Sequence, residues 1–478
     1  MTKLDSKVQL ICREVLRRVT PNPKDRIEIQ RFIGSLIDRL RFEIEKIGLE
    51  ADVCVEGSVA KDTWLRDEKD IDIFMLIPRR YGRKAFTKLL DAAKNVCGEK
   101  YLEAYAEHPY IEAEINGFTV DFVPCFKLRS AVEAISSVDR TPFHTSYVKN
   151  HLSQADREEV RLLKRFMHGI GAYGAEIKIG GFSGYLCELL IIYYGSFINV
   201  LKAASDWHGR ILIDLEGHYR GEEDKALKIF DQPLIVVDPV DKSRNVASAV
   251  RRERLSEFIA ASRCFLEDPR IEFFFPPRIK PFSVDEALKI MKLRGTSFIL
   301  LQTRSVKAVP DVLWGQLYKT QRALRELISR YDFEILRDAV WSDEKTIITF
   351  IFELKSHLLP SVEKHLGPPI MKKRDCMRFL EKHLKSERLI SGPRIEGDRW
   401  VIERRRQYRD AYTLLRDSLG DDGGKRIGVA KMISKAFSSS LKILTNEEIL
   451  GLYSENLDFA SFFTEYLIGK PRWLSRMK

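Results

Sequence analysis

Glu56-Gly-Ser-Val-Ala-Lys-Asp-Thr-Trp-Leu65 and, a few residues later, Asp70-Ile-Asp-Ile-Phe-Met-Leu-Ile77 are the stretches that decide the fold of this chain. The second begins with alternating charged and apolar residues, as in a strand with one buried face. The alternation puts the carboxylates of Asp70 and Asp72 on one face. The opposite face carries the apolar side chains Ile71, Ile73 and Met75. The sequence therefore predicts a strand with two carboxylates, preceded by a glycine-serine turn.

These carboxylates indicate a metal site. Two charged groups on one face of an otherwise buried strand repel each other and are costly to desolvate. A divalent cation removes that cost, and Mg²⁺ prefers carboxylate oxygens while keeping positions for water or phosphate. A third carboxylate, Asp121, follows the turn signal Asn116-Gly117 in the next predicted hairpin. Asp70, Asp72 and Asp121 are therefore the predicted catalytic, metal-binding residues of a two-Mg²⁺ site for attack on a phosphate.

The turn before the strand has the composition of a phosphate-binding loop. Glycine lets the backbone approach a phosphate closely, and a serine at a helix start offers its hydroxyl to the same anion. Lys61, one turn later, adds a positive charge. A lone Asp-x-Asp or Gly-Ser pair is usually a chance match or a simple turn. The order of the motifs and the eleven residues between them predict that Gly57, Ser58 and Lys61 bind a nucleotide.

The hydrophobic periodicity changes several times and indicates an α+β, multidomain protein. A long amphipathic helix from Pro23 to Gly48 precedes the short strand-like runs. The apolar segment 185–201 is predicted as one buried helix, too short and too polar to span a membrane. One strand, at 400–403, is predicted beyond residue 370. The predicted domains are an α+β head at 1–145, a helical neck at 146–272, a small α+β body at 273–370 and a mainly helical tail at 371–478.

Composition sets the remaining bounds. The 478 residues are 44% hydrophobic and 31% charged, with a net charge of +11, so the chain is globular and a polyanionic partner is allowed. The alternative to a polyanionic partner is that the net positive charge only aids solubility. The seven scattered cysteines form no Cys-x-x-Cys pair, and the start of the chain lacks a signal-peptide pattern. A reducing, cytoplasmic location and no membrane are expected.

The motifs together resemble the archaeal-type (class I) CCA-adding tRNA nucleotidyltransferases of the DNA polymerase β nucleotidyltransferase superfamily. The resemblance is dense between about residues 50 and 250 and thinner after 280. It rests on the stretches Glu56–Leu65, Asp70–Asp72, Tyr105–Tyr110, Val120–Cys125, Val138–His144, Glu159–Lys164, Tyr173–Glu176, Gly181–Leu190, Val237–Asp241 and Arg244–Ala247.

The resemblance implies a polymerase β-like nucleotidyltransferase head and a role for each matched residue. Asp70, Asp72 and Asp121 would carry the metals, and Asp121 would help to activate the primer 3′-hydroxyl. Ser58 and Lys61 would hold the triphosphate. Two departures are visible: Lys61 stands where arginine is expected in close relatives, which removes bidentate phosphate geometry, and Asp70 stands where glutamate also occurs.

Four further nucleotide-binding residues are implied by the resemblance, and each has a plainer interpretation. His144 and Lys164 would contact the sugar or phosphates, although a histidine after Pro-Phe can cap a helix and a lysine is usually solvated. Tyr173, the third such contact, can also be a packing aromatic. Arg244 would read the base, and its plainer role is an ion pair with Asp241.

The implied activity is template-independent addition and repair of the 3′-terminal CCA of tRNA from CTP and ATP, with release of pyrophosphate. A poly(A)-type polymerase and a catalytically silent RNA-binding protein are the alternatives. The implied partner is tRNA, held at its acceptor stem and elbow, and relatives suggest a homodimer. Five C-terminal aromatic residues favour a core over base stacking: Tyr453, Phe459, Phe462, Phe463 and Tyr466. Candidate phosphate contacts are the basic runs 251–252, 372–374, 404–406 and 425–426, with Lys435.

Overall fold

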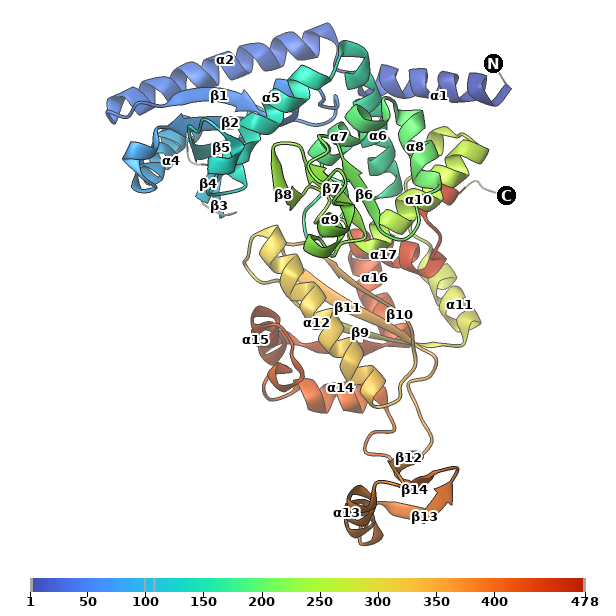
Figure 1. Ribbon diagram of the computed structural model, residues 1–478. Helices are drawn as coiled ribbons and strands as arrows, with labels where there is room; N and C mark the ends of the chain where they lie inside the picture. The colour runs from blue at the N-terminus through green and yellow to red at the C-terminus, as the bar shows by residue number, and fades with distance from the viewer. Residues whose placement is uncertain (1–2, 99, 106–108, 476–478) are drawn as a thin grey trace. The chain divides into compact units, whose positions relative to one another are not determined.

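The structure is a computed structural model that describes residues 3–98, 100–105 and 109–475 (Figure 1). Residues 106–108, half of the motif at 105–110, therefore lie outside the described residues. The chain divides into two compact units, and each is described by itself. Unit 1 combines Met1–Pro277 with Pro471–Lys478, and unit 2 is Arg278–Lys470. The predicted division into four domains stays a prediction.

The head of unit 1 is built on a five-stranded sheet in the order β1-β2-β5-β4-β3. The two strands that carry the predicted site, β2 and β5, run parallel, and the other neighbours are antiparallel. Asn116 and Gly117 both have positive φ and form the predicted turn between β4 and β5. The strands are β1 (Asp52–Glu56), β2 (Asp70–Ile77), β3 (Tyr101–Tyr105), β4 (Pro109–Ile115) and β5 (Phe118–Phe126).

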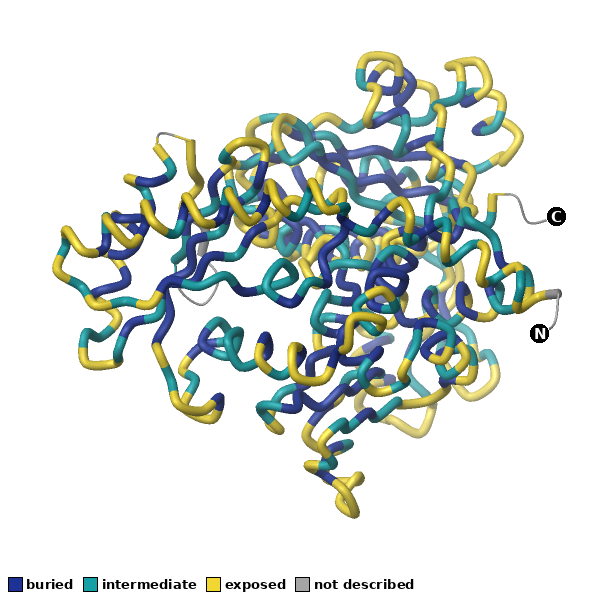
Figure 2. The backbone as a smooth tube through the Cα atoms, turned by 90° about the horizontal axis from the view of Figure 1, so that it is seen from above, coloured by how far each residue is buried: buried dark blue, intermediate teal, exposed yellow. Residues whose placement is uncertain are grey.

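One face of this sheet is covered by α2 (Pro23–Lys46) and α4 (Lys84–Cys97), which bury an apolar stripe against it. A capping box at Asn22 begins α2, as expected of a helix that starts after such a residue. The isoleucines and methionine of β2 lie in this core, which confirms the predicted alternation. Figure 2 shows buried strands beside helices whose turns alternate between buried and exposed. The charged face of β2 and β5 is thereby left for the site.

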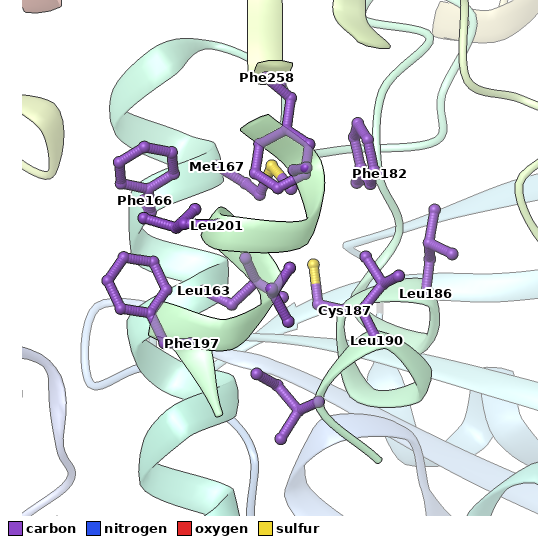
Figure 3. Packing of buried hydrophobic residues seen from close by; sticks show 14 of the residues in the cluster. Leu163, Phe166, Met167, Phe182, Leu186, Cys187, Leu190, Phe197, Leu201 and Phe258 are labelled. Carbon is purple, nitrogen blue, oxygen red and sulfur yellow. The ribbon is translucent and has the colours of Figure 1, made fainter. Parts of the chain in front are cut away.

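The rest of unit 1, for which we keep the word neck, packs helices around one aromatic core (Figure 3). Phe166 of α6 lies at its centre, with Phe197, Phe258, Phe265, Phe273 and Phe274 around it at ring distances of 5.5 to 6.4 Å. The helices are α1 (Lys3–Val19), α5 (Thr141–His151), α6 (Gln154–Ile170), α7 (Gly184–Tyr194), α8 (Phe197–Ser205), α9 (Glu223–Ile229) and α10 (Arg252–Glu267). A small sheet joins β6 (Ile211–Asp214), β7 (Leu234–Asp238) and β8 (Asp241–Asn245) in that order.

The prediction of one helix over 185–201 is wrong. Gly195 ends α7 with a φ of 83°, and the Ser196 side chain caps α8, so the chain turns by 90° between them. Among the described helices, none is by itself long and apolar enough to cross a membrane. Only this bent pair meets the length and composition criteria jointly. The apolar residues of both helices are buried in the neck core.

Unit 1 also contains the last described residues of the chain. Trp473 stacks on Phe273 with ring centroids 5.2 Å apart. Arg472 donates to the carbonyl of Pro277, with Nη2 at 3.1 Å from the oxygen. Chain segments separated by all of unit 2 therefore meet in the core and at the surface of unit 1.

Unit 2 contains two sheets. The larger has the order β10-β11-β9-β15, and the smaller has the order β12-β14-β13 with α13 packed on it. The strands are β9 (Ser297–Arg304), β10 (Ile335–Ser342), β11 (Ile347–Leu354), β12 (Val362–Pro369), β13 (Leu389–Glu396), β14 (Arg399–Arg405) and β15 (Lys442–Thr445). The helices are α11 (Val284–Arg294), α12 (Pro310–Arg330), α13 (Lys373–Leu384), α14 (Ala411–Leu419), α15 (Lys431–Ser440), α16 (Ile449–Glu455) and α17 (Leu457–Ile468).

Two predictions about this unit have clear outcomes. The prediction of a single strand beyond residue 370 is wrong, because the described chain there contains β13, β14 and β15. Gly392-Pro393 interrupts β13, and because glycine and proline are unfavourable inside strands, the sequence of β13 does not have a strand-like pattern. The core role of the C-terminal aromatics is confirmed, since Tyr453, Phe459 and Phe463 are buried and Phe462 and Tyr466 pack against them.

Candidate active site

The site begins with a row of carboxylates across the face of the head sheet opposite α2 and α4. Glu56 of β1 is paired with Asp72 of β2, Asp72 with Asp121 of β5, and Asp121 with Glu112 of β4. Side chains directly opposite one another point to the same face. Asp70 lies two residues before Asp72 and shares that face. The three predicted acids therefore lie together, and the register adds two glutamates that were not predicted.

Gly57 lies directly against this row. Its φ is +67°, and a Cβ atom added there would lie 1.8 Å from Oδ2 of Asp72. Glycine is thus required for the backbone conformation and for the close approach to the carboxylate. Ser58 follows in the first turn of the short helix α3 (Gly57–Lys61). The glycine-serine turn and the acidic strand consequently form one site.

The carboxylates raise one another's pKa. For Asp121, burial and then the charges of Asp72, Glu112 and Asp70 raise the pKa to about 7. Burial also raises the pKa of Asp72, and burial together with Glu68 raises that of Asp70. The Oδ1 atom of Asp121 is buried and accepts no hydrogen bond from any residue that the structure describes. The row therefore holds negative charge that the surrounding side chains compensate only in part.

A divalent cation fits this donor set. Carboxylate oxygens are the ligands that Mg²⁺ prefers, and a cation would compensate both the mutual repulsion and the orphaned Asp121 oxygen. Among the described residues, no three His, Cys, Asp or Glu side chains already converge on one metal position. The residues thus supply the chemistry of the site through Asp72 and Asp121 in register and Asp70 on the same face.

Lys61 lies beside the acidic row and is engaged in a buried ion pair. Its Nζ lies 2.5 Å from Oε2 of Glu188 on α7, and both side chains are almost completely buried. The Thr63 hydroxyl donates to the other oxygen of Glu188 at 2.5 Å. The positive charge of Lys61 also acts on Asp72 and lowers its pKa against the larger effect of burial. Lys61 therefore links the glycine-serine turn to the neck, and Glu188 is an additional member of the site.

Lys164 and Tyr173 meet on the neck side of the same turn. Lys164 is 1% exposed and donates from Nζ to the Thr63 carbonyl at 3.0 Å. A Cβ atom on Gly184 would lie 3.0 Å from the Tyr173 hydroxyl oxygen and 3.4 Å from Lys164 Nζ. Burial raises the pKa of Tyr173 well above its usual value. The plainer interpretation of Lys164 as a solvated lysine is wrong, because the side chain is buried.

His144 and Arg244 meet at a carboxylate that was not predicted, Asp238 at the end of β7. Oδ2 of Asp238 lies 2.7 Å from Nη1 of Arg244 and 3.0 Å from Nε2 of His144. The His144 ring stacks on Tyr185 at 4.2 Å, and Lys61 Nζ lies 5.7 Å from the centroid of that tyrosine. A continuous line of contacts therefore runs from the glycine-serine turn to Arg244.

This arrangement changes the plainer interpretation of Arg244. Its ion-pair partner is Asp238, and Asp241 instead pairs with Arg140 at 2.8 Å. The pKa of His144 is lowered because burial outweighs the attraction of Asp238. Asp238, Glu188 and Tyr185 all lie within the quoted motif stretches. Each of the three side chains contacts a residue that is far away in sequence, so local sequence patterns could not assign it a role.

Comparison with family models finds three matches in chain order. Residues 37–144 match the nucleotidyltransferase domain. Residues 158–275 match the second domain of tRNA nucleotidyltransferase, and residues 294–445 match the C-terminal domain of CCA-adding enzyme. The first match contains the acidic row and His144, and the second contains Tyr185, Asp238 and Arg244.

The chain is also similar over most of its length to curated archaeal proteins. It is 36% identical to the CCA-adding enzyme of Methanosarcina barkeri, covering 95% of this chain and 97% of the relative. It is 38% identical to that of Methanothermobacter thermautotrophicus, with 89% and 92% covered. For the CCA-adding enzyme of Saccharolobus islandicus the identity is 37%, with 86% and 92% covered.

Proposed function

We propose that CTP and ATP are the nucleotide substrates of this chain, which belongs to the family of CCA-adding enzymes, and that Mg²⁺ is its metal. The chain is a nucleotidyltransferase that adds CCA to tRNA. The observation that carries the proposal is the in-register pair Asp72 and Asp121 beside Gly57. Such a site suits attack of a primer 3′-hydroxyl on the α-phosphate of a nucleotide, with pyrophosphate leaving.

Each predicted residue then has a task. Asp70, Asp72 and Asp121 would hold the metal, which when bound lowers the hydroxyl's pKa and neutralises developing charge. Asp121 would also help to activate the attacking hydroxyl by accepting its proton. The close backbone approach at Gly57 and the hydroxyl of Ser58 would orient the triphosphate.

The buried cations form a second group of binding residues. Lys61 and Lys164 flank Thr63 from the head and the neck, and their positive charges would favour the phosphates. Tyr173 lies next to Lys164 on the neck side of the glycine-serine turn. His144 would contact the sugar or phosphates, and Arg244, whose side chain is 34% exposed, would offer its remaining donors to the base.

The decisive experiment uses tRNA that lacks its last three nucleotides. Wild-type protein should add two C and one A and then stop, and chelation of divalent metal should end the reaction. Asp72→Ala should abolish addition and retain tRNA affinity, whereas Glu114→Gln, an exposed acid on β4 of the same sheet, should extend normally. Extension by Asp72→Ala at the wild-type rate would refute the assignment of the site.

The same assay separates the alternatives. An open-ended adenosine tail would indicate a poly(A)-type polymerase, and tRNA binding without any nucleotide addition would indicate a silent RNA-binding protein. Contact with the acceptor stem and elbow, a homodimer and a cytoplasmic location belong to the same proposal.

Of the basic candidates, Arg404 and Arg406 already pair with Glu363 inside unit 2. Lys372, Lys373 and Arg374 at the start of α13 are therefore the first choice for a tRNA-binding test, in which affinity should fall with salt.

A further inference from the structure

Asp238 is the point at which four elements of the neck meet. Its carboxylate is fully buried at the end of β7. Oδ2 receives Arg244 from β8 and His144 from α5, and Oδ1 accepts from the Tyr185 hydroxyl of α7 at 3.3 Å and from the Val240 amide at 3.1 Å. Both oxygens of the carboxylate are thus occupied, and each bond fixes a different side chain or turn.

Burying a carboxylate is expensive unless charged partners compensate it. Here the hydrogen bonds and charges of His144 and Arg244 outweigh burial and lower the pKa of Asp238. The carboxylate therefore stays ionised, and a hydrogen bond between an ion pair is about twice as strong as a neutral one. For His144, the contact requires a proton on Nε2, which fixes the tautomer of a neutral imidazole and leaves Nδ1 as the acceptor.

The exposure of Arg244 distinguishes this cluster from an ion pair that serves only the core. The Asp238 side chain is 0% exposed, whereas that of Arg244 is 34% exposed. One N–H donor is used by Asp238, and a guanidinium carries five donors in a rigid plane. Fixing one edge of the plane therefore sets the direction of the donors that remain at the accessible end.

We propose that Asp238 is a positioning residue for nucleotide selection: its carboxylate holds the guanidinium of Arg244 and the imidazole of His144 in one fixed relative orientation. This inference rests on the proposed function for the identity of the nucleotides, CTP and ATP. The second tie, between Arg140 and Asp241, joins the start of α5 to β8 and keeps the two elements that carry His144 and Arg244 together.

The test is the variant Asp238→Asn, which keeps the shape of the side chain and removes its charge. We expect the KM for CTP and ATP to rise about tenfold to hundredfold, the range expected when a hydrogen bond to a charged group is lost. The kcat at saturating nucleotide should change less, and discrimination against UTP and GTP should fall about tenfold. Asp231→Asn removes an exposed carboxylate from the loop before β7, outside the Asp238 cluster, and should keep wild-type discrimination.

A double-mutant cycle separates positioning from general damage. If Asp238 acts through Arg244, then Asp238→Asn should add little to the loss caused by Arg244→Ala. Full additivity of the two losses would overturn the inference. Should Asp238→Asn fail to fold, Tyr185→Phe removes one of the two hydrogen bonds to Oδ1 of the same carboxylate and should raise the KM about two- to fivefold. An unchanged KM in that variant would equally overturn the inference.

Equilibrium binding of CTP and ATP distinguishes failure of this inference from failure of the proposed function. Weaker nucleotide binding by Asp238→Asn supports the inference even if wild-type protein does not extend tRNA. Unchanged nucleotide binding and discrimination overturn it even if wild-type protein adds CCA normally.

Discussion

Asp121→Asn should make the metal-free protein more stable while it destroys the activity. The folded protein holds the Asp121 carboxylate among other acids, and its pKa is about 7 against a usual 3.8. The folded state therefore binds this proton more tightly than the unfolded state does. The resulting cost of ionisation is absent below about pH 4, grows between pH 4 and 7, and is complete above pH 7.

The magnitude follows from the shift. About three pKa units at 1.36 kcal/mol each give an upper bound of about 4 kcal/mol. Asp70 is exposed and Asp121 only partly buried, so solvent screening and rotation of the carboxylates relieve part of the repulsion, and about 1–3 kcal/mol is expected. An asparagine of the same shape carries no charge and avoids this cost. The gain should be present in full at pH 8 and fall to about a quarter of that at pH 4.5.

The assay is urea unfolding in EDTA at both pH values, repeated with Mg²⁺. Because the metal compensates the acids, Mg²⁺ should stabilise wild-type protein more than Asp121→Asn and narrow the difference between them. Glu114→Gln on the neighbouring strand is the matched control, with an effect within about 0.5 kcal/mol at either pH. Equal stability of Asp121→Asn and wild type at pH 8 in EDTA would refute this reasoning, as would the same gain at both pH values.

Two other variants test the contacts around the glycine-serine turn. Gly57→Ala should lower activity at least about a hundredfold, because the added Cβ would overlap the Asp72 carboxylate. Gly48→Ala is the control: Gly48 has a similar φ of +65° but lies in open space, so this substitution should cost only about 1 kcal/mol of stability. Normal nucleotide addition by Gly57→Ala would contradict the close contact. Glu188→Ala should destabilise the protein by about 3–5 kcal/mol because it leaves the Lys61 charge buried, and the double variant with Lys61→Met should recover part of that loss in a melting experiment. No recovery in the double variant would argue against a buried ion pair.

The head could be predicted well because its signals are local. Alternation along 70–77 is a property of neighbouring residues, and it correctly placed Ile71 and Ile73 in the core. The turn at Asn116-Gly117 is equally local. Once two strands pair in register, their acids meet on one face, so Asp72 and Asp121 lie together as predicted.

The partners of the cations could not be predicted, because they depend on contacts across long separations. Lys61 and Glu188 are 127 residues apart, and His144 and Asp238 are 94 residues apart. The plainer alternative for Arg244 is an ion pair with Asp241, a neighbour in sequence, whereas the folded chain pairs it with Asp238. The bend between α7 and α8 was missed because the apolar residues continue across Gly195 and only the cap at Ser196 marks the new helix.

The contacts of Arg472 and Trp473 make unit 2 an insertion within unit 1. The carbonyl of Pro277 and the guanidinium of Arg472 are within hydrogen-bond distance, so the two cut ends of unit 1 are neighbours. A short linker could join them and omit residues 278–470, and the shortened chain would retain the acidic row and the Asp238 cluster. During synthesis, moreover, the aromatic core around Phe273 receives Trp473 only after all of unit 2 has been translated. The aromatic core of unit 1 is therefore completed only after the whole of unit 2 has been synthesised.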